Sequence, residues 1–525
     1  MNLVRSDYPE LVFGIAAPIG VHIDAICESL ANELQIVRYQ SHTIKITDLI
    51  GDFPSGVAKP SGQDFGSIIS YKIDHANALC DQFAEPSVLA RIAVREIRKL
   101  RFSHTHDDEV IPPRVAYIIR QLKRPQEVQL LRQIYGRQFI LISAYGADVD
   151  RRNIISERLK RTLPTSTTTS EIASRTEQLI DRDAEEGADT GQHLRDTFHL
   201  GDVFIDGINK QEMDGKLHRF VQAFFGRTDT APSKDEYGMY AAKSASLRSS
   251  DLSRQVGAAI FSDDGEIITQ GCNEVPKAFG GTYWDGENPD FRDVVIGHDP
   301  NDAMKKEVLR EVLERLDNSG LLSETAKQHG TPSVLLEVLC KKPTAEDIKR
   351  NDGTGSLLGS AFLDITEFGR IVHAEMCAVC DAARLGKSIK GATLYCTTFP
   401  CHNCTKHLLA AGIKRVVYIE PYPKSKAKDL HANEVAIEVE VQGKVSFVPF
   451  LGISPFRYRD IFQKGRRKEK SGAARRWVDD DNAPKPMLDA AFPSYLEVEL
   501  AALLTFTGSL IASSGAANTP EASAG

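Results

Sequence analysis

The stretch from His373 to Cys404, HAEMCAVCDAARLGKSIKGATLYCTTFPCHNC, decides the fold of the second half of the chain. Its hydrophobic periodicity predicts a helix over 373–386, a strand over 392–399 and a second helix over 400–412. Gly386 and Gly412 stand where the two helices should end. A further strand, KRVVYIE over 414–420, follows. Strands that alternate with helices predict an α/β fold with a mostly parallel sheet.

The same stretch contains the residue types and spacing of a catalytic zinc site. His373 and Glu375 form H-x-E, and Pro400, Cys401 and Cys404 form P-C-x-x-C, which together are the pattern of zinc deaminases. Proline suits the first turn of a helix, so the two cysteines, three residues apart, project from one helix face. A helix N-terminus also favours the metal-binding thiolate. His373, Cys401 and Cys404 are therefore the predicted zinc ligands.

Three protein ligands leave the fourth tetrahedral position open for water, which is typical of a catalytic zinc. Zinc lowers the pKa of such a water to about 7. Glu375 is the predicted catalytic residue, which takes the proton of the water and passes it to ring nitrogen N3 while C4 is attacked. The alternative is a closed structural site, with Cys396 or Cys377 as the fourth ligand.

Length and composition favour a protein of two domains that works in the cytoplasm. The chain has 525 residues, 42% of them hydrophobic and 26% charged, with a net charge of −8. The net charge argues against a protein built mainly to coat nucleic acid. The first twenty residues do not have the pattern of a secretory signal, and no apolar run is long enough to span a membrane. The nine cysteines cluster late, which indicates metal binding rather than disulfides.

Changes in composition along the chain predict the domain boundaries. Residues 1–225 alternate strands and helices, and 226–236 have the Pro, Ser, Thr and Asp content of a linker. Residues 237–480 form the predicted second domain, with an insert over 280–365 that separates its first hairpin from the metal motif. Residues 481–525 form a C-terminal extension whose small, polar end is predicted to be disordered.

The N-terminal domain starts with a degenerate phosphate-loop motif. Gly14 follows an apolar strand and Gly20 precedes a helix, with Pro18 between them. A phosphate loop has four residues between its glycines and then Lys and Ser/Thr, whereas this chain has five, followed by Val21 and His22. Gly14, Pro18 and Gly20 remain candidates for binding an anion at the helix N-terminus. The domain is interpreted first as a nucleotide-sensing or assembly domain, then as an inert scaffold or a kinase.

One dense basic stretch, KGRRKEKSGAARR over 464–476, stands near the C-terminus. It is interpreted as a site for RNA phosphates, as a segment that closes over a nucleotide triphosphate, or as a solvated tail. No aromatic residues are interleaved for base stacking before Trp477.

With these motifs placed, residues 237–431 resemble the deoxycytidylate deaminases. LSRQVGAAIFSDDGEIITQGCNEVP, over 252–276, resembles their first hairpin, and YPKSKAKDLH, over 422–431, the segment after their last core strand. The resemblance implies that Asn273 binds the sugar and that Arg254 lies near the phosphate. Cys377 departs from the family, where many relatives have Asn.

The chain as a whole resembles a narrower family, the two-domain bacterial anti-phage deaminases. The blocks that carry this resemblance are ELVFGIAAPIGVHID, YIIRQLKRPQEVQLLRQIYG, GGTYWDGENPDFRDVVIGHDPND and ISPFRYRDIF. It implies a P-loop kinase-like wound sheet followed by a cytidine-deaminase-like α/β/α domain. It also implies deamination of dCTP and dCMP to dUTP and dUMP, which drains the dCTP pool during infection. Further implications are a regulatory nucleotide at the N-terminal domain, a small inhibitory RNA in some members and a homohexamer.

Three other functions compete with this prediction. One is a housekeeping dCMP deaminase that supplies dUMP, but such an enzyme needs only the second domain. Another is a deaminase that edits polynucleotides, which the net charge of −8 disfavours. The third, from a different class, is a nucleotide-sensing protein with a structural zinc.

Overall fold

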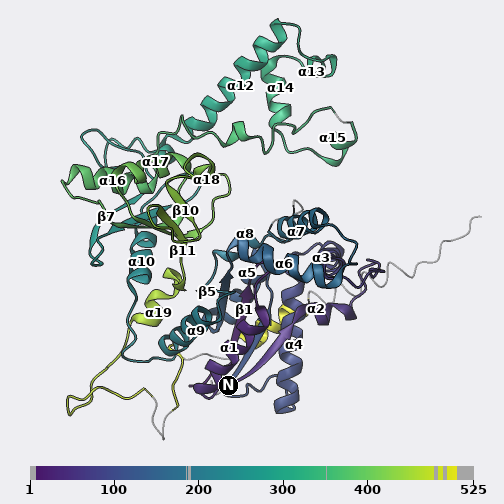
Figure 1. Ribbon diagram of the computed structural model, residues 1–525, viewed down its shortest axis with the longest axis vertical. Coiled ribbons are helices and arrows are strands. Elements are labelled where there is room, and N and C mark those ends of the chain that lie inside the picture. The colour runs from purple at the N-terminus through teal and green to yellow at the C-terminus, as the bar shows by residue number, and fades with distance from the viewer. Residues whose placement is uncertain are drawn as a thin grey trace, which may run out of the picture. The chain divides into compact units, whose positions relative to one another are not determined.

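A computed structural model describes residues 7–184, 186, 191–350, 352–477, 483–488 and 494–504. The chain forms two compact units (Figure 1). Unit 1 consists of residues 1–240 and 449–525, and unit 2 of residues 241–448. The predicted α/β class is confirmed, because each unit is built around a six-stranded sheet with helices.

The sheet of unit 1 has the strand order β12-β5-β4-β1-β3-β2. Its strands are β1 (Leu11–Ala16), β2 (Gln40–Lys45), β3 (Val115–Arg120), β4 (Phe139–Tyr145), β5 (Val203–Asp206) and β12 (Gly452–Ile453). Five strands are parallel, and β12 pairs antiparallel with β5 at the edge. The central strands β1, β3 and β4 are mostly apolar and almost wholly buried, as expected for a parallel sheet covered by helices on both faces.

Two hydrophobic cores lie on the two faces of this sheet. One contains α1 (Ile23–Ile36) and α9 (Lys210–Phe224), and the other contains α4 (Val88–Thr105) and α5 (Pro125–Tyr135). A smaller core joins α6 (Asp148–Thr162) and α7 (Thr169–Ala184). The other helical segments are α2 (Ile46–Leu49), η1 (Ile50–Asp52), α3 (Phe65–Gln82), η2 (Gly136–Gln138), α8 (Leu194–Phe198), η4 (Pro455–Arg457) and α19 (Tyr458–Phe462).

After unit 2 the chain returns to unit 1 at residue 449. The sequence-based boundary of the second domain, at residue 480, is therefore too late. Residues 449–480 were assigned to the second domain, but β12 extends the unit 1 sheet and Arg457 bonds to Asp202 at 3.1 Å. The predicted linker 226–236 ends inside α10 (Lys234–Ser246), within which the chain passes from unit 1 to unit 2. A two-residue edge strand has no periodicity that a sequence pattern could reveal.

The C-terminal extension is part of unit 1 rather than a separate tail. Residues 495–504 are helical, and Tyr495 and Ala502 are buried in the core that contains α4 and α5. The predicted disorder of the final residues concerns positions outside the described ranges.

The sheet of unit 2 has the strand order β10-β11-β9-β8-β6-β7. Its strands are β6 (Gly257–Phe261), β7 (Ile267–Cys272), β8 (Thr393–Thr398), β9 (Arg415–Glu420), β10 (Val435–Ile437) and β11 (Val445–Pro449). β6 pairs antiparallel with β7 and β8, and β8 pairs parallel with β9. The helices α16 (Ala374–Arg384), α17 (His402–Ala411) and α18 (Ala427–Leu430) pack around one core.

The insert of unit 2 forms its own small helical layer. Its segments are α11 (Asp293–Ile296), α12 (Pro300–Asn318), α13 (Glu324–Gln328), α14 (Pro332–Cys340), α15 (Ala345–Arg350) and η3 (Ala361–Asp364). Leu309, Leu313, Leu335 and Leu336 join α12 to α14.

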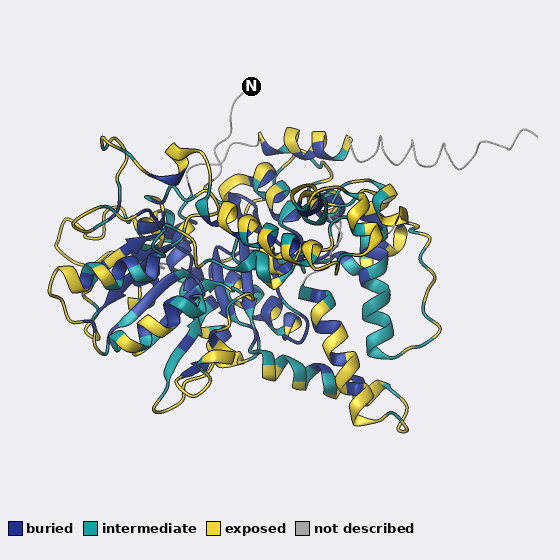
Figure 2. Ribbon diagram, turned by 90° about the horizontal axis from the view of Figure 1, so that it is seen from above, coloured by how far each residue is buried: buried dark blue, intermediate teal, exposed yellow. Residues whose placement is uncertain are grey.

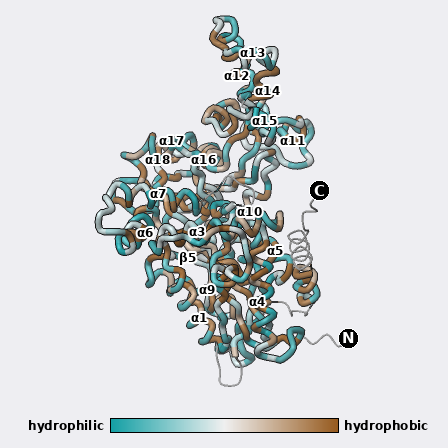
Figure 3. Tube along the Cα trace, turned by 90° about the vertical axis from the view of Figure 1, so that its right-hand side faces the viewer, coloured by the Kyte–Doolittle hydropathy of each residue, from teal (hydrophilic) through white to brown (hydrophobic). Residues whose placement is uncertain are grey.

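Burial is greatest in the central strands of both sheets, such as β1, β4 and β6, and the helices carry exposed residues (Figure 2). Hydrophilic and hydrophobic residues are interspersed along the described chain (Figure 3). Within the described ranges no helix has the length and apolar character needed to cross a membrane.

Candidate metal centre

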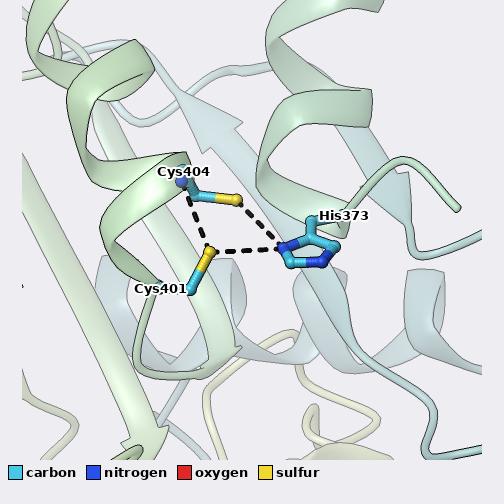
Figure 4. A group of neighbouring side chains, drawn as sticks. All are labelled: His373, Cys401 and Cys404. Carbon is cyan, nitrogen blue, oxygen red and sulfur yellow. Dashed lines mark hydrogen bonds between the residues drawn. The ribbon is translucent and has the colours of Figure 1, made fainter. Parts of the chain in front are cut away.

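His373, Cys401 and Cys404 converge in unit 2, as the sequence motif predicts (Figure 4). The Nδ1 atom of His373 lies 3.4 Å from the Sγ atoms of both cysteines. Their possible ligand atoms all lie within 4.8 Å of one another. This is the single group of three or more potential metal ligands found among the described residues.

The starts of two helices hold these ligands. His373 is the N-cap of α16, and Cys401 is the N-cap of α17, where its Sγ accepts a hydrogen bond from the backbone N–H of Cys404 at 3.4 Å. Gly271 of β7 lets α16 approach closely, since a Cβ there would lie 2.5 Å from the carbonyl oxygen of Ala374. The register of α16 on β7 therefore sets where His373 and Glu375 stand.

His373 and Cys401 hold a proton between them at the point where a metal would bind, and a bound zinc ion would displace it. The Cys404 hydrogen bond and the neighbouring His373 lower the pKa of Cys401 to about 4, so Cys401 is a thiolate. The hydrogen bond to Cys401 in turn raises the pKa of His373 to about 9, against the opposing effect of burial. A thiolate beside an imidazole and a second cysteine is a donor set that zinc prefers. The three residues can therefore hold a zinc ion.

Cys396 and Cys377, the alternative fourth ligands, are not in this group. Both are buried, and burial raises the pKa of each thiol, to about 11 for Cys377. Because neither sulfur belongs to the converging group, the geometry favours the open, three-ligand arrangement over the closed one.

Glu375 stands in the first turn of α16 and is 4% exposed. Burial raises the pKa of its carboxyl group, while the positive charge of His373 and a hydrogen bond with Cys404 lower it in part. His373, Glu375 and Cys401 line one cavity of about 230 Å³. A buried acid with a raised pKa next to a metal group is suited to proton transfer.

Arg254 and Asn273 line the same cavity. The Asn273 amide nitrogen donates to Asp251 at 2.9 Å and to the Arg254 carbonyl at 2.8 Å, and its oxygen accepts from the backbone of Val256 at 2.7 Å. Asn273 thus shapes the loop that carries Arg254. The Arg254 guanidinium is part-exposed and pairs with Glu420 at 2.7 Å.

Sequence reasoning missed the wall that the insert contributes to this cavity. Asp293, Asp299 and Asn301 of the insert line it, and so does Arg370, which lies after the insert and three residues before His373. The three insert residues are far in sequence from the metal motif, and no spacing rule ties them to it.

The phosphate-loop candidates Gly14, Pro18 and Gly20 lie in unit 1 and not with the metal group. Gly14 is packed in β1, where a Cβ would lie 2.5 Å from Leu122, and Pro18 and Gly20 line a separate cavity of about 350 Å³.

An internal carboxylate occupies part of this loop. Asp183 accepts a hydrogen bond from the backbone N–H of Ile19 at 2.7 Å, and Lys123 donates to Asp183 at 2.7 Å and to the Ala17 carbonyl at 2.6 Å. The backbone N–H of Ile19, which could otherwise donate to a phosphate, is thus already bonded to Asp183.

The metal group lies within a region that matches a known protein family. Residues 232–420 match the cytidine and deoxycytidylate deaminase zinc-binding region. Unit 2 therefore carries a zinc-binding deaminase domain.

Among individual proteins, the deoxycytidylate deaminase of Enterobacteria phage T4 is 51% identical over 55 residues, 10% of this chain and 28% of the phage protein. ComE operon protein 2 of Bacillus subtilis is 32% identical over 91 residues, 15% of this chain and 48% of that protein. The chain thus spans less than half the length of these curated relatives.

A solved dCMP deaminase from the cyanophage S-TIM5, in complex with dCMP and dUMP, is 19% identical with a TM-score of 0.22. The alignment covers 42% of this chain and 98% of the cyanophage protein. A likeness at this score does not bear on the function.

Proposed function

We propose that the protein is a zinc-dependent hydrolase that deaminates free deoxycytidine nucleotides, converting dCTP to dUTP and dCMP to dUMP. One observation carries the proposal: two zinc ligands, His373 and Cys401, line one cavity with the buried carboxyl group of Glu375, and Cys404 completes the ligand set. The deoxycytidylate deaminases among the relatives support the choice of substrate.

In this reaction water replaces the amino group at C4 of cytosine, which gives uracil and ammonia. His373, Cys401 and Cys404 would hold the zinc, which when bound lowers the pKa of water towards about 7. Glu375 accepts a proton from the attacking water and delivers it to ring nitrogen N3. It then helps to protonate the departing amine. A pKa raised by burial suits this role, because the same carboxyl group must accept and release a proton near neutral pH.

The sides of the cavity suggest how a nucleotide is held. Arg254 is proposed to lie near the phosphate, because its guanidinium is part-exposed at the cavity. Asn273 stays the predicted sugar ligand, but to bind a sugar it would have to exchange or share one of its three hydrogen bonds.

We further propose, from the family resemblance, that the activity drains dCTP during phage infection. A homohexamer, a regulatory nucleotide at unit 1 and an inhibitory small RNA stay predictions of that resemblance. A cytoplasmic location stays a prediction from the sequence pattern.

The test is deamination of dCTP, dCMP, CTP and single-stranded DNA by the zinc-loaded protein. Glu375→Gln should lower the turnover of deoxycytidine nucleotides by a factor of about 10² to 10⁴, because the proton carrier is lost. It should retain one zinc per chain, whereas Cys404→Ser should lose the metal.

Glu434→Gln is the matched control, since Glu434 is exposed in the same unit and should be neutral. A fully active Glu375→Gln protein would contradict the mechanism. Turnover of single-stranded DNA alone would contradict the substrate.

A further inference from the structure

The wall that the insert contributes to the catalytic cavity carries two buried oxygen atoms with no hydrogen-bond partner. They are Oδ1 of Asp293 and Oδ1 of Asn301, and the two residues are 3% and 7% exposed. Both residues line the cavity that contains His373 and Glu375. Buried acceptors without a partner are uncommon in folded proteins, and each calls for an explanation.

The orientation of Asn301 is fixed by its other bonds. Its amide nitrogen donates to the Ile365 carbonyl at 3.0 Å, and its backbone N–H donates to Asp299, the N-cap of α12, at 2.8 Å. Because the amide nitrogen is bonded to Ile365, the amide oxygen Oδ1 is the atom that can accept a hydrogen bond from a ligand in the cavity.

Asp293 begins α11 and forms an ion pair with Arg370 at 3.2 Å, without the alignment of a hydrogen bond. The ion pair balances the charge of Asp293, but its Oδ1 atom can still accept a hydrogen bond. Arg370 also donates to the Phe291 carbonyl at 2.7 Å, which holds the guanidinium in place.

The chemistry of these atoms limits what they can bind. Two acceptors need a ligand with hydrogen-bond donors, and a fully ionised phosphate has none. A metal ion is not favoured, because the His373 group is the one set of three converging metal ligands within the described residues. On a cytosine nucleotide the donors are the amino group, which leaves during the reaction, and the sugar hydroxyl groups.

We propose that Asp293 and Asn301 bind the 3′-hydroxyl group of the deoxyribose, and that the insert thereby selects free nucleotides over residues within a polynucleotide. Inside a DNA strand the 3′ oxygen is esterified and carries no hydrogen to donate. An internal residue of DNA would give neither acceptor a hydrogen-bond donor, whereas a free nucleotide supplies one. Sites built to bind a hydroxyl group discriminate strongly against analogues that lack it. This assignment rests on the proposed deaminase function.

The experiment compares dCMP and dCTP with their 2′,3′-dideoxy analogues as substrates of the zinc-loaded, full-length protein. The wild-type protein should lose at least about tenfold in kcat/KM on the dideoxy analogues. Asn301→Leu should lose a similar factor on dCMP and dCTP, yet match the wild type on the dideoxy analogues.

Two variants support the comparison. Asn318→Leu makes the same chemical change at an exposed position on α12 and should leave every rate unchanged. Asp293→Asn keeps the shape of the side chain. It should also lower the ratio of kcat/KM on dCMP to kcat/KM on its dideoxy analogue. Zinc content is measured for each variant to show that the site is intact.

The outcomes separate this assignment from the function on which it rests. Equal kcat/KM for dCMP and its dideoxy analogue in the wild-type protein would overturn the assignment while leaving the deaminase standing. Equal losses on both substrates in Asn301→Leu would show a structural role and overturn it as well. A zinc-loaded wild type that deaminates no cytosine nucleotide would refute the proposed function, and the assignment with it.

Discussion

Lys464 opens the basic stretch 464–476, but its ammonium group is partly buried in unit 1. Its Nζ donates to the Ala223 carbonyl at 3.0 Å and lies 3.3 Å from the sulfur of Met487. Burial lowers the pKa of Lys464 to about 8, and the charge of Arg467 adds to the effect. The first residue of the stretch is thus held against the protein rather than free for an outside polyanion.

The depressed pKa predicts how stability depends on pH. Between about pH 8 and 10.5 the unfolded chain keeps a proton on Lys464 that the folded chain has lost, so this residue makes stability rise with pH. Below pH 8 both states are protonated, and the folded state bears the full cost of burying the charge. Lys464→Met should therefore stabilise unit 1 at pH 7, and its advantage should shrink from pH 8 to 10.5.

Urea unfolding of both proteins across this range measures the difference. Lys468→Met, at an exposed position nearby, serves as the control. A constant difference between Lys464→Met and the wild type at every pH would contradict the prediction.

At the scale of single residues, the metal group was predictable and its surroundings were not. His373, Glu375, Cys401 and Cys404 are set by spacing within two helix starts, and local spacing is visible in the sequence. The bonds of Asn273 and the unpaired oxygen of Asn301 depend on tertiary contacts between distant segments. The carboxylate of Asp183 at the N-terminal loop lies 164 residues from Ile19, so the loop motif alone could not predict it.

Among the elements, the helix over 495–504 is tied to unit 1 by a buried ionic network. Arg101, fully buried, donates hydrogen bonds to Glu499 and to Glu10, and Tyr495 donates to Glu10 at 2.9 Å. Arg98 also lies 3.4 Å from Glu499. Arg98 also pairs with Asp108, so every charged group of the network has a partner of opposite charge. Hydrophobic periodicity could not foresee this contact, since it depends on polar side chains.

Breaking the network should destabilise unit 1 strongly. Glu499→Ala removes one partner from a buried guanidinium, which typically costs about 3–5 kcal/mol. Glu497→Ala changes an exposed residue of the same helix and should stay within about 0.5 kcal/mol of the wild type. Denaturant unfolding followed by circular dichroism compares the two. Equal stability of the variants would show that the helix does not support the unit.

At the scale of the whole chain, unit 2 is inserted into unit 1 between α10 and β12. Alternation of strands and helices predicted both sheets. A boundary based on composition could not show that residues 449–477 belong to unit 1, where β12 adds an edge strand to the sheet. Their attachment depends on Arg457, which bonds to Asp202 at 3.1 Å and to the Arg137 carbonyl at 3.1 Å.

A chain that ends after Val448 should therefore lose the stability of unit 1 and keep the metal site. All three zinc ligands and Glu375 lie within 241–448, so about one zinc per chain should remain. Asp202, fully buried, would lose its Arg457 partner, which points to a loss of several kcal/mol in unit 1.

Limited proteolysis and zinc analysis measure the two effects separately. In the full-length chain, Arg457→Ala should loosen unit 1 in the same direction, and Arg459→Ala, at an exposed site on α19, should not. Equal protease resistance of the truncated and full-length proteins would rule out the dependence.

The insertion also has a consequence in time. A ribosome makes β1 to β5 first, then the whole of unit 2, and only afterwards β12 and Arg457. At about 5 to 20 residues per second, the intervening segment takes roughly 10 to 40 s to synthesise. During that interval the sheet of unit 1 lacks β12, and Asp202 lacks its partner Arg457. In the folded protein Arg132, at 3.3 Å, is the other cationic partner of Asp202, and it is synthesised before unit 2. The unit that begins the chain is thus the last to be completed, and the deaminase domain can fold before it.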